Sequence, residues 1–472
     1  MKNVNSLLSL DEILKATSGT FVLGSRELFF DNVQTDSRLV KENTLFVPLI
    51  GENQDGHKYT GEALKKGASV VFIAASNYKK DGEYFKQLSE QFKNASFIAV
   101  ENTLHALQDA AARYVEKFPS LLKIAVTGSS GKTTTKEIAA SLLREKYDVI
   151  TNKGNLNSET GLPLSVFEIR EHHTAGIFEM GMNRENEIGE IAAVLKPELA
   201  IVTNIGNAHV GKLGSRENIA REKAKVFSFF NGKGTGFIPS GDDFEAFLEK
   251  SVNGKCIKYG EGLDPDVVCV KDMGLGGTLM RIMGEEVLFP LPGKYNCKNA
   301  LSAVALAKYL GLSGEQIRHA LSSFKPLSGR TEILNGKFRI VKDCYNANPD
   351  SMEKAIEFVS SVETSSKKIV VLGDMLELGE ESASAHKKTG ELILEMKPYL
   401  AVFCGTEMKY AYDAVVSGSP AFDVHYIEGH SDDDMERIVS LIKQKASEED
   451  IVLIKGSRGM ALERVAAGLL EV

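Results

Sequence analysis

The sequence predicts an α/β protein of three domains, with a mainly parallel sheet in the central domain. Three observations lead to this prediction. The chain has 472 residues, and at about 150 residues per domain that length favours three separate cores over one. Short apolar runs alternate with helical patterns, which is typical of parallel strands joined by helices. One of these runs leads into a loop of glycine, serine and threonine that precedes a helix.

The first predicted domain covers residues 1–97. Ser9 and Glu12 have the spacing of a capping box, which predicts a helix that begins there. A second predicted helix ends at Gly67 and separates two apolar runs, so this domain is expected to be α/β. The apolar runs that predict its strands are residues 44–50, 68–75 and 96–100.

The second predicted domain covers residues 98–325. A helical pattern at residues 187–195 lies between two apolar runs, which indicates a parallel sheet. The glycine-rich stretch 232–291 predicts a less regular insertion, and a helix at 299–310 closes the segment. The predicted strands are residues 123–127, 175–180 and 199–204.

The third predicted domain covers residues 326–472 and is expected to be Rossmann-like, because it repeats the alternation of strands and helices. Pro326 and Gly329 mark the linker that precedes it. Its predicted strands are residues 338–344, 368–372, 400–404 and 451–454.

Composition excludes several classes of protein. Hydrophobic residues make up 43% of the chain and charged residues 25%, which rules out disordered and fibrous proteins. The net charge of −8 argues against binding nucleic acid through a basic face. No apolar run reaches the ~20 residues of a membrane-spanning helix, and the N-terminus lacks a signal-peptide pattern. We therefore expect a cytoplasmic protein that binds neither nucleic acid nor membrane.

The cysteines are few and scattered. Their number is odd and none forms a Cys-x-x-Cys pair, so we expect neither a disulfide framework nor a structural zinc site. Small buried apolar side chains are the better interpretation. The residues are Cys256, Cys269, Cys297, Cys344 and Cys404.

The strongest local signal is the loop after the strand at 123–127. Its backbone N–H groups can surround phosphate oxygens, and the N-terminus of the following helix favours an anion. Lys132 can reach the outer phosphates, and Thr133 can place its hydroxyl on Mg²⁺. Val126 stands where the general pattern has its first glycine, so the loop matches a shorter form; the alternative is a plain strand-to-helix turn. The loop residues are Gly128, Ser129, Ser130, Gly131, Lys132, Thr133 and Thr134.

Polar side chains follow the next two strands. Glu179 ends the strand at 175–180, where a metal-bound nucleotide would lie in an open parallel sheet. His209 follows the strand at 199–204 and can ligate a metal or contact phosphate. The plain alternatives are a surface carboxylate and a structural histidine, and Lys223 with Lys225 can equally form a solvated helix face.

These motifs resemble, in order and spacing, those of the Mur ligases, the ATP-dependent amide-forming enzymes of bacterial peptidoglycan precursor synthesis. The resemblance covers nearly the whole chain. Residues 345–352 and 373–379 resemble the branch of the family that adds D-alanyl-D-alanine. Besides the phosphate loop, the matching motifs are residues 179–181, 203–209, 223–227, 293–300, 326–330, 343–352, 371–379 and 453–458.

The resemblance implies an N-terminal domain that binds a UDP-sugar, a central ATPase domain with the phosphate loop, and a C-terminal domain that contacts ATP and the incoming dipeptide. The implied substrates are UDP-MurNAc-tripeptide and D-Ala-D-Ala, which the enzyme would join through an acyl phosphate. The family is usually monomeric. We expect the site to close as the third domain swings about residues 325–330.

The resemblance also implies a role for single residues. Lys132 would contact the β- and γ-phosphates, and Lys132, His209 and Lys223 would be catalytic. Two Mg²⁺ ions are implied, one on Thr133 and Glu179 and a second on His209, with Lys223 carbamylated so that it becomes a carboxylate-like metal ligand. Asn296 and Asn299 would bracket the adenine, and Arg330 and Asp343 would contact the nucleotide from the third domain. The implied substrate residues are Ser37, Arg38, Asn346, Asn348, Lys455 and Arg458.

Rival functions stay open at this point. Inside the family they are a sister ligase that adds a single amino acid and a folate polyglutamylating enzyme, both disfavoured by residues 345–352. Outside it they are a P-loop kinase and a nucleotide-dependent switch. Phosphate release that needs both a carboxylate acceptor and an amine would separate these functions.

Overall fold

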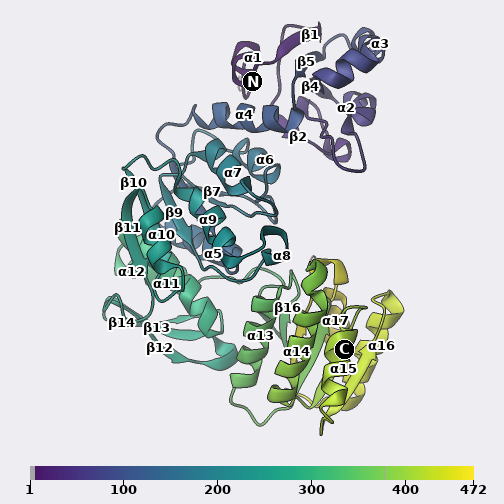
Figure 1. Ribbon diagram of the computed structural model, residues 1–472. Coiled ribbons are helices and arrows are strands. Elements are labelled where there is room, and N and C mark those ends of the chain that lie inside the picture. The colour runs from purple at the N-terminus through teal and green to yellow at the C-terminus, as the bar shows by residue number, and fades with distance from the viewer. Residues whose placement is uncertain (1–5, 377, 472) are drawn as a thin grey trace.

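The computed structural model describes residues 6–376 and 378–471 of the protein. Three α/β units follow one another along the chain, with the N-terminal unit at the top of Figure 1, the central unit below it and the C-terminal unit at the bottom. The predicted three-domain α/β architecture is therefore confirmed. Glu377, within the motif at 371–379, lies outside the described residues. No helix in the described part of the chain is long and apolar enough to cross a membrane.

The N-terminal unit is built on a sheet with strand order β1-β5-β4-β3-β2. Strand β1 is antiparallel to β5, and the other neighbours are parallel. Helix α1 begins with the predicted capping box, in which the Ser9 side chain accepts from the Glu12 N–H and the Glu12 carboxylate accepts from the Ser9 N–H. The elements are α1 (Leu10–Thr17), β1 (Thr20–Gly24), β2 (Asn32–Gln34), β3 (Thr44–Phe46), α2 (Thr60–Lys65), β4 (Ala68–Ala74), α3 (Ala75–Gln91) and β5 (Ser96–Val100).

Helix α4 (Thr103–Val115) joins the N-terminal unit to the central unit. It packs against α1 on one side and against α6 and α7 on the other. Leu107 and Ala111 of α4 belong to one buried cluster with Ile13 of α1 and Ile188 of α7, so a shared core runs from one unit into the next. A boundary at residue 97 would cut β5, so our proposed division places the first boundary after Val100.

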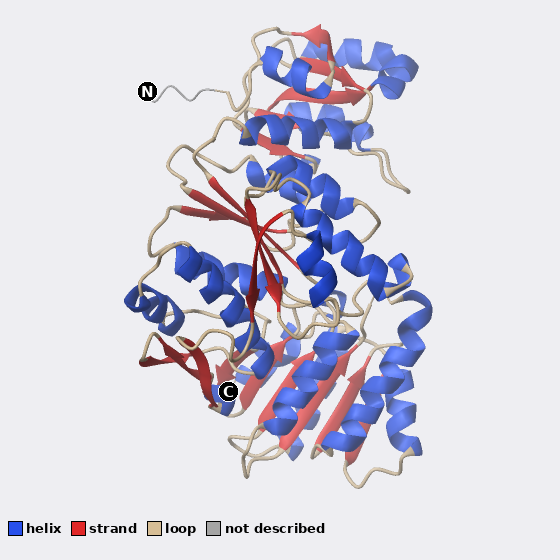
Figure 2. Ribbon diagram, turned by 60° about the vertical axis from the view of Figure 1, so that its left-hand side comes forward, coloured by secondary structure: helices blue, strands red, loops and turns tan. Residues whose placement is uncertain are grey.

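The central unit is a parallel sheet with strand order β11-β10-β9-β6-β8-β7. Figure 2 shows helices on both faces of this sheet. Helix α7 has the bounds that the sequence predicts, whereas α11 begins five residues before Asn299. The elements are β6 (Leu122–Thr127), α5 (Lys132–Leu143), β7 (Val149–Thr151), α6 (Gly161–Val166), β8 (Ala175–Glu179), α7 (Glu187–Leu195), β9 (Leu199–Val202), α8 (Val210–Leu213), α9 (Arg216–Ala224), β10 (Gly234–Pro239), α10 (Glu245–Ser251), β11 (Gly254–Tyr259), α11 (Lys294–Tyr309) and α12 (Gly314–Ser322).

The prediction of a less regular insertion at 232–291 is wrong for its first part. Strands β10 and β11 pair in parallel with the central sheet and extend it beyond β9. A Cβ on Gly234 would lie 2.2 Å from the Phe230 ring, and one on Gly236 would lie 2.7 Å from Val252. These glycines therefore make room for packed side chains and do not mark irregular chain. Only β12 (Val267–Asp272), β13 (Thr278–Ile282) and β14 (Glu285–Phe289) form a separate antiparallel sheet.

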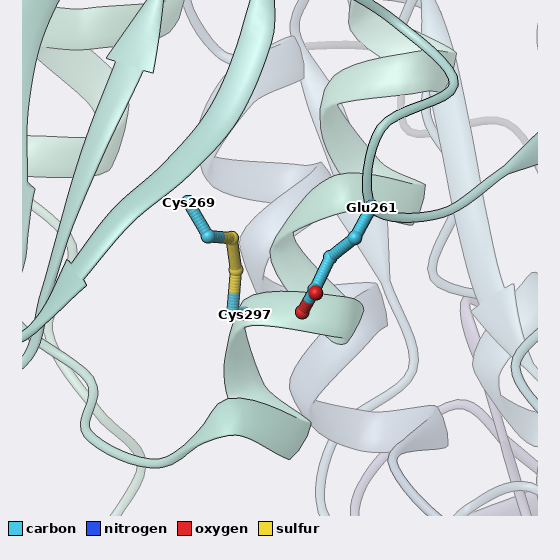
Figure 3. Close-up of side chains that lie close together, drawn as sticks. All are labelled: Glu261, Cys269 and Cys297. Carbon is cyan, nitrogen blue, oxygen red and sulfur yellow. A yellow bond between two sulfur atoms is a disulfide. The ribbon is translucent and has the colours of Figure 1, made fainter.

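The interpretation of the cysteines as small buried apolar side chains, with no disulfide framework, is wrong for two of them. Cys269 of β12 and Cys297 of α11 form a disulfide that ties the small sheet to the helix, with their Cα atoms 6.8 Å apart (Figure 3). The Glu261 carboxylate and the two sulfur atoms lie within 4.8 Å of one another. Bonded sulfurs offer no thiolate, so this group is a poor metal site. Cys344 and Cys404 are buried free thiols, as predicted.

The C-terminal unit is a sheet with strand order β15-β16-β20-β17-β18-β19, with helices on both faces. Strand β15 is antiparallel to β16, and the remaining neighbours are parallel, as a Rossmann-like unit requires. The elements are β15 (Glu332–Asn335), β16 (Arg339–Asp343), α13 (Pro349–Ser361), β17 (Lys368–Gly373), α14 (Ser382–Met396), β18 (Leu400–Cys404), α15 (Lys409–Ser417), β19 (Asp423–Ile427), α16 (Asp432–Lys445), β20 (Ile451–Lys455) and α17 (Glu463–Leu470).

Candidate active site

The candidate site lies where the carboxyl ends of β6, β8 and β9 meet, at the N-terminus of α5. The predicted phosphate loop leaves β6 at Gly128 and enters α5 at Lys132. Gly128 has φ +145°, and a Cβ on it would lie 1.8 Å from Thr203 Oγ1. Gly131 has φ +78°, and a Cβ there would lie 2.4 Å from Asn299 Oδ1. Both positions therefore require glycine for the tight turn and for the close approach of neighbouring chain.

Polar side chains that follow β9 hold the loop in shape. Asn204 Oδ1 accepts from the Ser130 N–H at 3.1 Å, and Asn204 Nδ2 donates to the Ser130 hydroxyl at 3.0 Å. Thr203 Oγ1 donates to the Ser130 carbonyl at 2.6 Å, and Ser129 Oγ accepts from the Gly206 N–H at 2.8 Å. The segment that follows β9 thus holds the phosphate loop in its conformation before any ligand binds. Thr203 and Asn204 belong to the motif at 203–209, but no role in the site is predicted for them, although their place after a strand is a usable signal.

The Lys132 ammonium lies inside the loop. Its Nζ donates to the carbonyls of Gly128 at 3.0 Å and Ser129 at 3.4 Å. Burial lowers the pKa of Lys132, the Glu179 carboxylate opposes that shift, and Arg330 adds to it. Lys132 is therefore held beside the place where the loop amides converge, as a phosphate-binding lysine must be.

Thr133 and Glu179 face each other across the carboxyl end of the sheet. Thr133 Oγ1 donates to Glu179 Oε2 at 2.5 Å, and both side chains are buried. The other carboxylate oxygen accepts from Asn157 Nδ2 at 2.6 Å, and Asn152 Oδ1 accepts from the Glu179 N–H. The surrounding amides thus fix the carboxylate, so Glu179 is not a plain surface residue. Thr134 follows Thr133 in the first turn of α5 and is half-buried.

Lys223 and His209 complete the cluster. Lys223 is fully buried on α9, and its Nζ donates to the Gly128 carbonyl at 2.9 Å, so it is not part of a solvated face. Burial and the nearby Lys132 hold the pKa of Lys223 well below its usual range. His209 lies at the start of α8, and burial together with Lys132 and Lys223 lowers its pKa to about 3. The ring is therefore neutral at physiological pH, which is the form that ligates metals.

Asn296 and Asn299 approach the loop from the first turns of α11. Both are buried, and Asn299 Nδ2 donates to Asn296 Oδ1 at 3.2 Å. Asn296 Nδ2 also donates to the Pro292 carbonyl at 2.7 Å. Since Asn299 Oδ1 lies against Gly131, this pair borders the phosphate loop.

The C-terminal unit contributes a charged cluster. Asp343 Oδ2 pairs with the buried Lys455 ammonium at 2.6 Å, and its Oδ1 accepts from the Thr331 N–H at 2.9 Å. Arg330 stacks on the Tyr345 ring with its guanidinium carbon 4.2 Å from the centroid. Lys455 is therefore engaged by Asp343, while the planar cation of Arg330 is positioned near Lys132.

The remaining predicted substrate residues belong to the C-terminal and N-terminal units, and the Asn346 carbonyl accepts from Lys455 Nζ at 3.3 Å. Asn348 is the N-cap of α13, where its Oδ1 accepts from the Ser351 N–H at 2.8 Å. Asn346 and Arg458 are exposed, and Arg458 pairs with Glu463 at 3.2 Å. Ser37, which donates to Glu62, and Arg38, which pairs with Asp36, lie on the 3-10 helix Ser37–Leu39 of the N-terminal unit.

The residues around the loop fit a nucleoside triphosphate and magnesium. Gly128 and Gly131 let the loop turn tightly, so that its backbone N–H groups can face phosphate oxygens. The N-terminus of α5 and the Lys132 ammonium add positive charge at the same place. The Thr133 hydroxyl and the Glu179 carboxylate are hard oxygen donors that converge on one point, which is the ligand type that Mg²⁺ prefers.

Three family models match the chain. The Mur ligase family, catalytic domain matches residues 30–115, the Mur ligase middle domain matches residues 126–307, and the Mur ligase, glutamate ligase domain matches residues 329–458. The matches follow the order of the three units.

Relatives with similar sequences extend over the whole chain. A protein of Treponema pallidum named UDP-N-acetylmuramoyl-tripeptide–D-alanyl-D-alanine ligase is 41% identical, with 97% of this chain and 98% of the relative covered. A protein of Bacillus subtilis with the same name is 34% identical over 93% of both chains. The crystal structure of MurF from Acinetobacter baumannii is similar with a TM-score of 0.84 and 27% identity, covering 98% of this chain and 99% of that one.

A structure of MurF ligase from Thermotoga maritima in complex with ADP is similar with a TM-score of 0.78 and 25% identity, covering 95% of this chain and 99% of that chain. The family models, the full-length relatives and the solved structures thus agree with the motifs and with the geometry of the phosphate loop. The chain belongs to the Mur ligase family.

Proposed function

We propose that this protein is the ATP-dependent ligase that adds D-alanyl-D-alanine to UDP-N-acetylmuramoyl-tripeptide, giving UDP-MurNAc-pentapeptide, ADP and phosphate in peptidoglycan precursor synthesis. The observation that carries the proposal is the 41% identity, over 97% of the chain, to a relative of that name. The phosphate loop and the cations around it supply the chemistry that such a ligase needs.

The first step is the attack of the tripeptide carboxylate on the γ-phosphate of ATP. A carboxylate–phosphorus bond forms, and the bond between the γ-phosphorus and the ADP oxygen breaks. The loop N–H groups and the N-terminus of α5 bind the phosphate oxygens, and Lys132 neutralises charge on the outer phosphates. Asn296 and Asn299 would hold the adenine, and Arg330 and Asp343 would contact the nucleotide from the C-terminal unit.

Thr133 and Glu179 would hold one Mg²⁺, and His209 with Lys223 a second. When bound, these ions offset the negative charge of the approaching oxygens. Lys223 would serve as a carbamate, formed when its neutral amine attacks CO₂ and releases a proton. The lowered pKa of Lys223 supports this, because only the neutral amine is nucleophilic.

The second step is the attack of the D-Ala-D-Ala amine on the acyl phosphate. The amide bond forms through a tetrahedral intermediate, and phosphate leaves. Because water would hydrolyse the acyl phosphate, the site must exclude it, and a swing of the C-terminal unit about residues 325–330 would do so. Asn346, Asn348, Lys455 and Arg458 would face the dipeptide, and Ser37 and Arg38 the UDP-sugar. The protein would act as a monomer in the cytoplasm.

Phosphate release under defined substrate mixtures tests this proposal. We expect release from ATP to require both UDP-MurNAc-tripeptide and D-Ala-D-Ala. Release with a single amino acid in place of the dipeptide would indicate a sister ligase. Loss of the γ-phosphate to a hydroxyl, with no free phosphate, would indicate a kinase, and either result would overturn the proposal.

A further inference from the structure

Helix α13 of the C-terminal unit meets the phosphate loop of the central unit. The helix begins with Asn348 as N-cap and Pro349 in its first turn, and it lies on the side of its unit nearest the central unit (Figure 1). Asp350 and Lys354 are four residues apart, so they lie on one face of the helix. Both of these side chains contact the central unit.

Asp350 docks the helix on the loop that follows β9. Its Oδ2 accepts from the Asn207 N–H at 3.0 Å, and its Oδ1 accepts from Asn207 Nδ2 at 3.3 Å. A Cβ on Gly206 would lie 2.1 Å from Asp350 Oδ2, so the carboxylate occupies space that only glycine leaves free. Gly206 itself donates to Ser129 of the phosphate loop. Asp350 therefore binds the residue that directly follows Gly206, whose N–H donates to the phosphate loop.

Lys354 extends from the next turn to the phosphate loop. Its Nζ donates to Ser130 Oγ at 3.1 Å, across 224 residues of sequence. Within residues 6–376 and 378–471, this hydroxyl is the one hydrogen-bond partner of the ammonium, and no carboxylate lies within ion-pair distance. A half-buried ammonium with a single neutral partner still has two N–H groups to donate.

The charges around Lys354 favour an anion at this place. Burial lowers its pKa, Asp350 opposes that shift, and the Lys298 ammonium of α11 adds to it, while Glu357 and Glu353 of its own helix oppose it more weakly. On the loop side lies the Lys132 ammonium, which donates to the Gly128 and Ser129 carbonyls. The Lys132 and Lys354 ammonium groups therefore both contact the phosphate loop, and a phosphate chain is the anion whose shape and charge match this place.

We propose that Lys354 is a further phosphate-binding residue, which the C-terminal unit supplies to the γ-phosphate of ATP and then to the phosphoryl group of the acyl phosphate. Asp350 is the positioning residue that places it. This inference rests on the proposed function for the acyl phosphate, whereas the contact with the γ-phosphate needs only ATP binding. Lys354 donates hydrogen bonds and keeps its proton in both steps. The docked C-terminal unit thereby completes the phosphate site.

Nucleotide binding by the full chain tests the proposal directly. In Lys354→Met, which keeps the apolar stem, the Kd for a non-hydrolysable ATP analogue should rise about 10- to 100-fold, as expected for one charge-assisted hydrogen bond. The Kd for ADP, which lacks the γ-phosphate, should change by less than about 2-fold. Lys354→Arg should retain most of the affinity for the analogue, and Lys387→Met, an exposed lysine on α14, is the matched control.

Turnover gives the second readout. We expect kcat to fall about 100-fold in Lys354→Met, the loss typical of one donor that stabilises a transition state. Asp350→Asn should lower kcat without changing the Kd for ADP, and its effect should not add to that of Lys354→Met, because both act through one contact. Equal losses for ADP and the ATP analogue, or an unchanged kcat, would overturn the inference. If the wild-type protein shows no dipeptide-dependent phosphate release, the proposed function fails, while the two Kd values still decide the role of Lys354.

Discussion

At the scale of single residues, the site depends on small groups in unusual surroundings. Gly128 has no side chain, which leaves room for the close approach of Thr203. The Glu179 carboxylate is buried between Thr133 and Asn157, and both donate hydrogen bonds to it. The Lys223 amine is fully buried, and its burial and the nearby Lys132 hold its pKa well below its usual range. Each of these features lowers the stability of the folded protein when taken alone, and features of this kind cluster at functional sites.

The substitution Gly128→Ala tests the close approach in the phosphate loop. The added Cβ would lie 1.8 Å from Thr203 Oγ1, and φ is +145°, so the loop must shift. We expect the Kd for ATP to rise at least 10-fold, since the loop amides would no longer converge. Gly82→Ala on α3, where nothing lies within 4 Å, is the control. Unchanged ATP binding in Gly128→Ala, measured by calorimetry, would contradict the assigned geometry.

Glu179→Gln tests the proposed magnesium ligand. The two side chains have nearly the same shape, so the melting temperature should stay close to that of the wild type. The charge is lost, so we expect kcat to fall about 100-fold or more and the half-saturating Mg²⁺ concentration to rise. A variant whose magnesium dependence matches that of the wild type would show that Glu179 holds no metal.

At the scale of elements, the sequence predicts best where the pattern is local. Strand β18 and helix α7 match their predicted bounds, and the phosphate loop is recognised from its own residues. Strands β10 and β11 look irregular in sequence because glycine composition does not show that Gly234 and Gly236 make room for the packed side chains of Phe230 and Val252. The Cys269–Cys297 disulfide and the contacts of Asp350 and Lys354 join residues that only the tertiary fold brings together.

Asn348 illustrates how a motif residue can have a structural role. The resemblance implies a substrate contact, whereas its side chain caps α13. We expect Asn348→Ala to lower the free energy of unfolding by about 1 kcal/mol, the usual loss for an N-cap, and Asn348→Ser to restore most of it. Denaturant unfolding checks the stability. If Asn348→Ser keeps stability but raises KM for D-Ala-D-Ala, then the residue contacts the dipeptide as well.

At the scale of the whole molecule, the site is shared between two units. The central unit supplies the phosphate loop and the proposed metal ligands, and the C-terminal unit supplies Arg330 and α13. An acyl phosphate needs such an arrangement, because water must be kept out of the site. The C-terminal unit that would exclude water also carries the cations Arg330 and Lys354. The N-terminal unit is joined to the central unit through a continuous core, so the swing about residues 325–330 that we propose would move the C-terminal unit.

Gly206→Ala tests the docking of the two units. The new Cβ would lie 2.1 Å from Asp350 Oδ2, so the contact between α13 and the loop after β9 must open. We expect kcat to fall about 10-fold or more through misplacement of the C-terminal unit. The affinity for UDP-MurNAc-tripeptide should stay the same. Full activity together with an unchanged radius of gyration in small-angle scattering would contradict a docked catalytic state.

The most direct test of the central claim is the mass of the reaction product. The protein is incubated with ATP, Mg²⁺ and UDP-MurNAc-tripeptide, with D-Ala-D-Ala or D-Ala alone as the amine. The account predicts a UDP-MurNAc-pentapeptide with the dipeptide and no new product with D-Ala. A product extended by a single residue, or a phosphorylated sugar with no new amide bond, would contradict it.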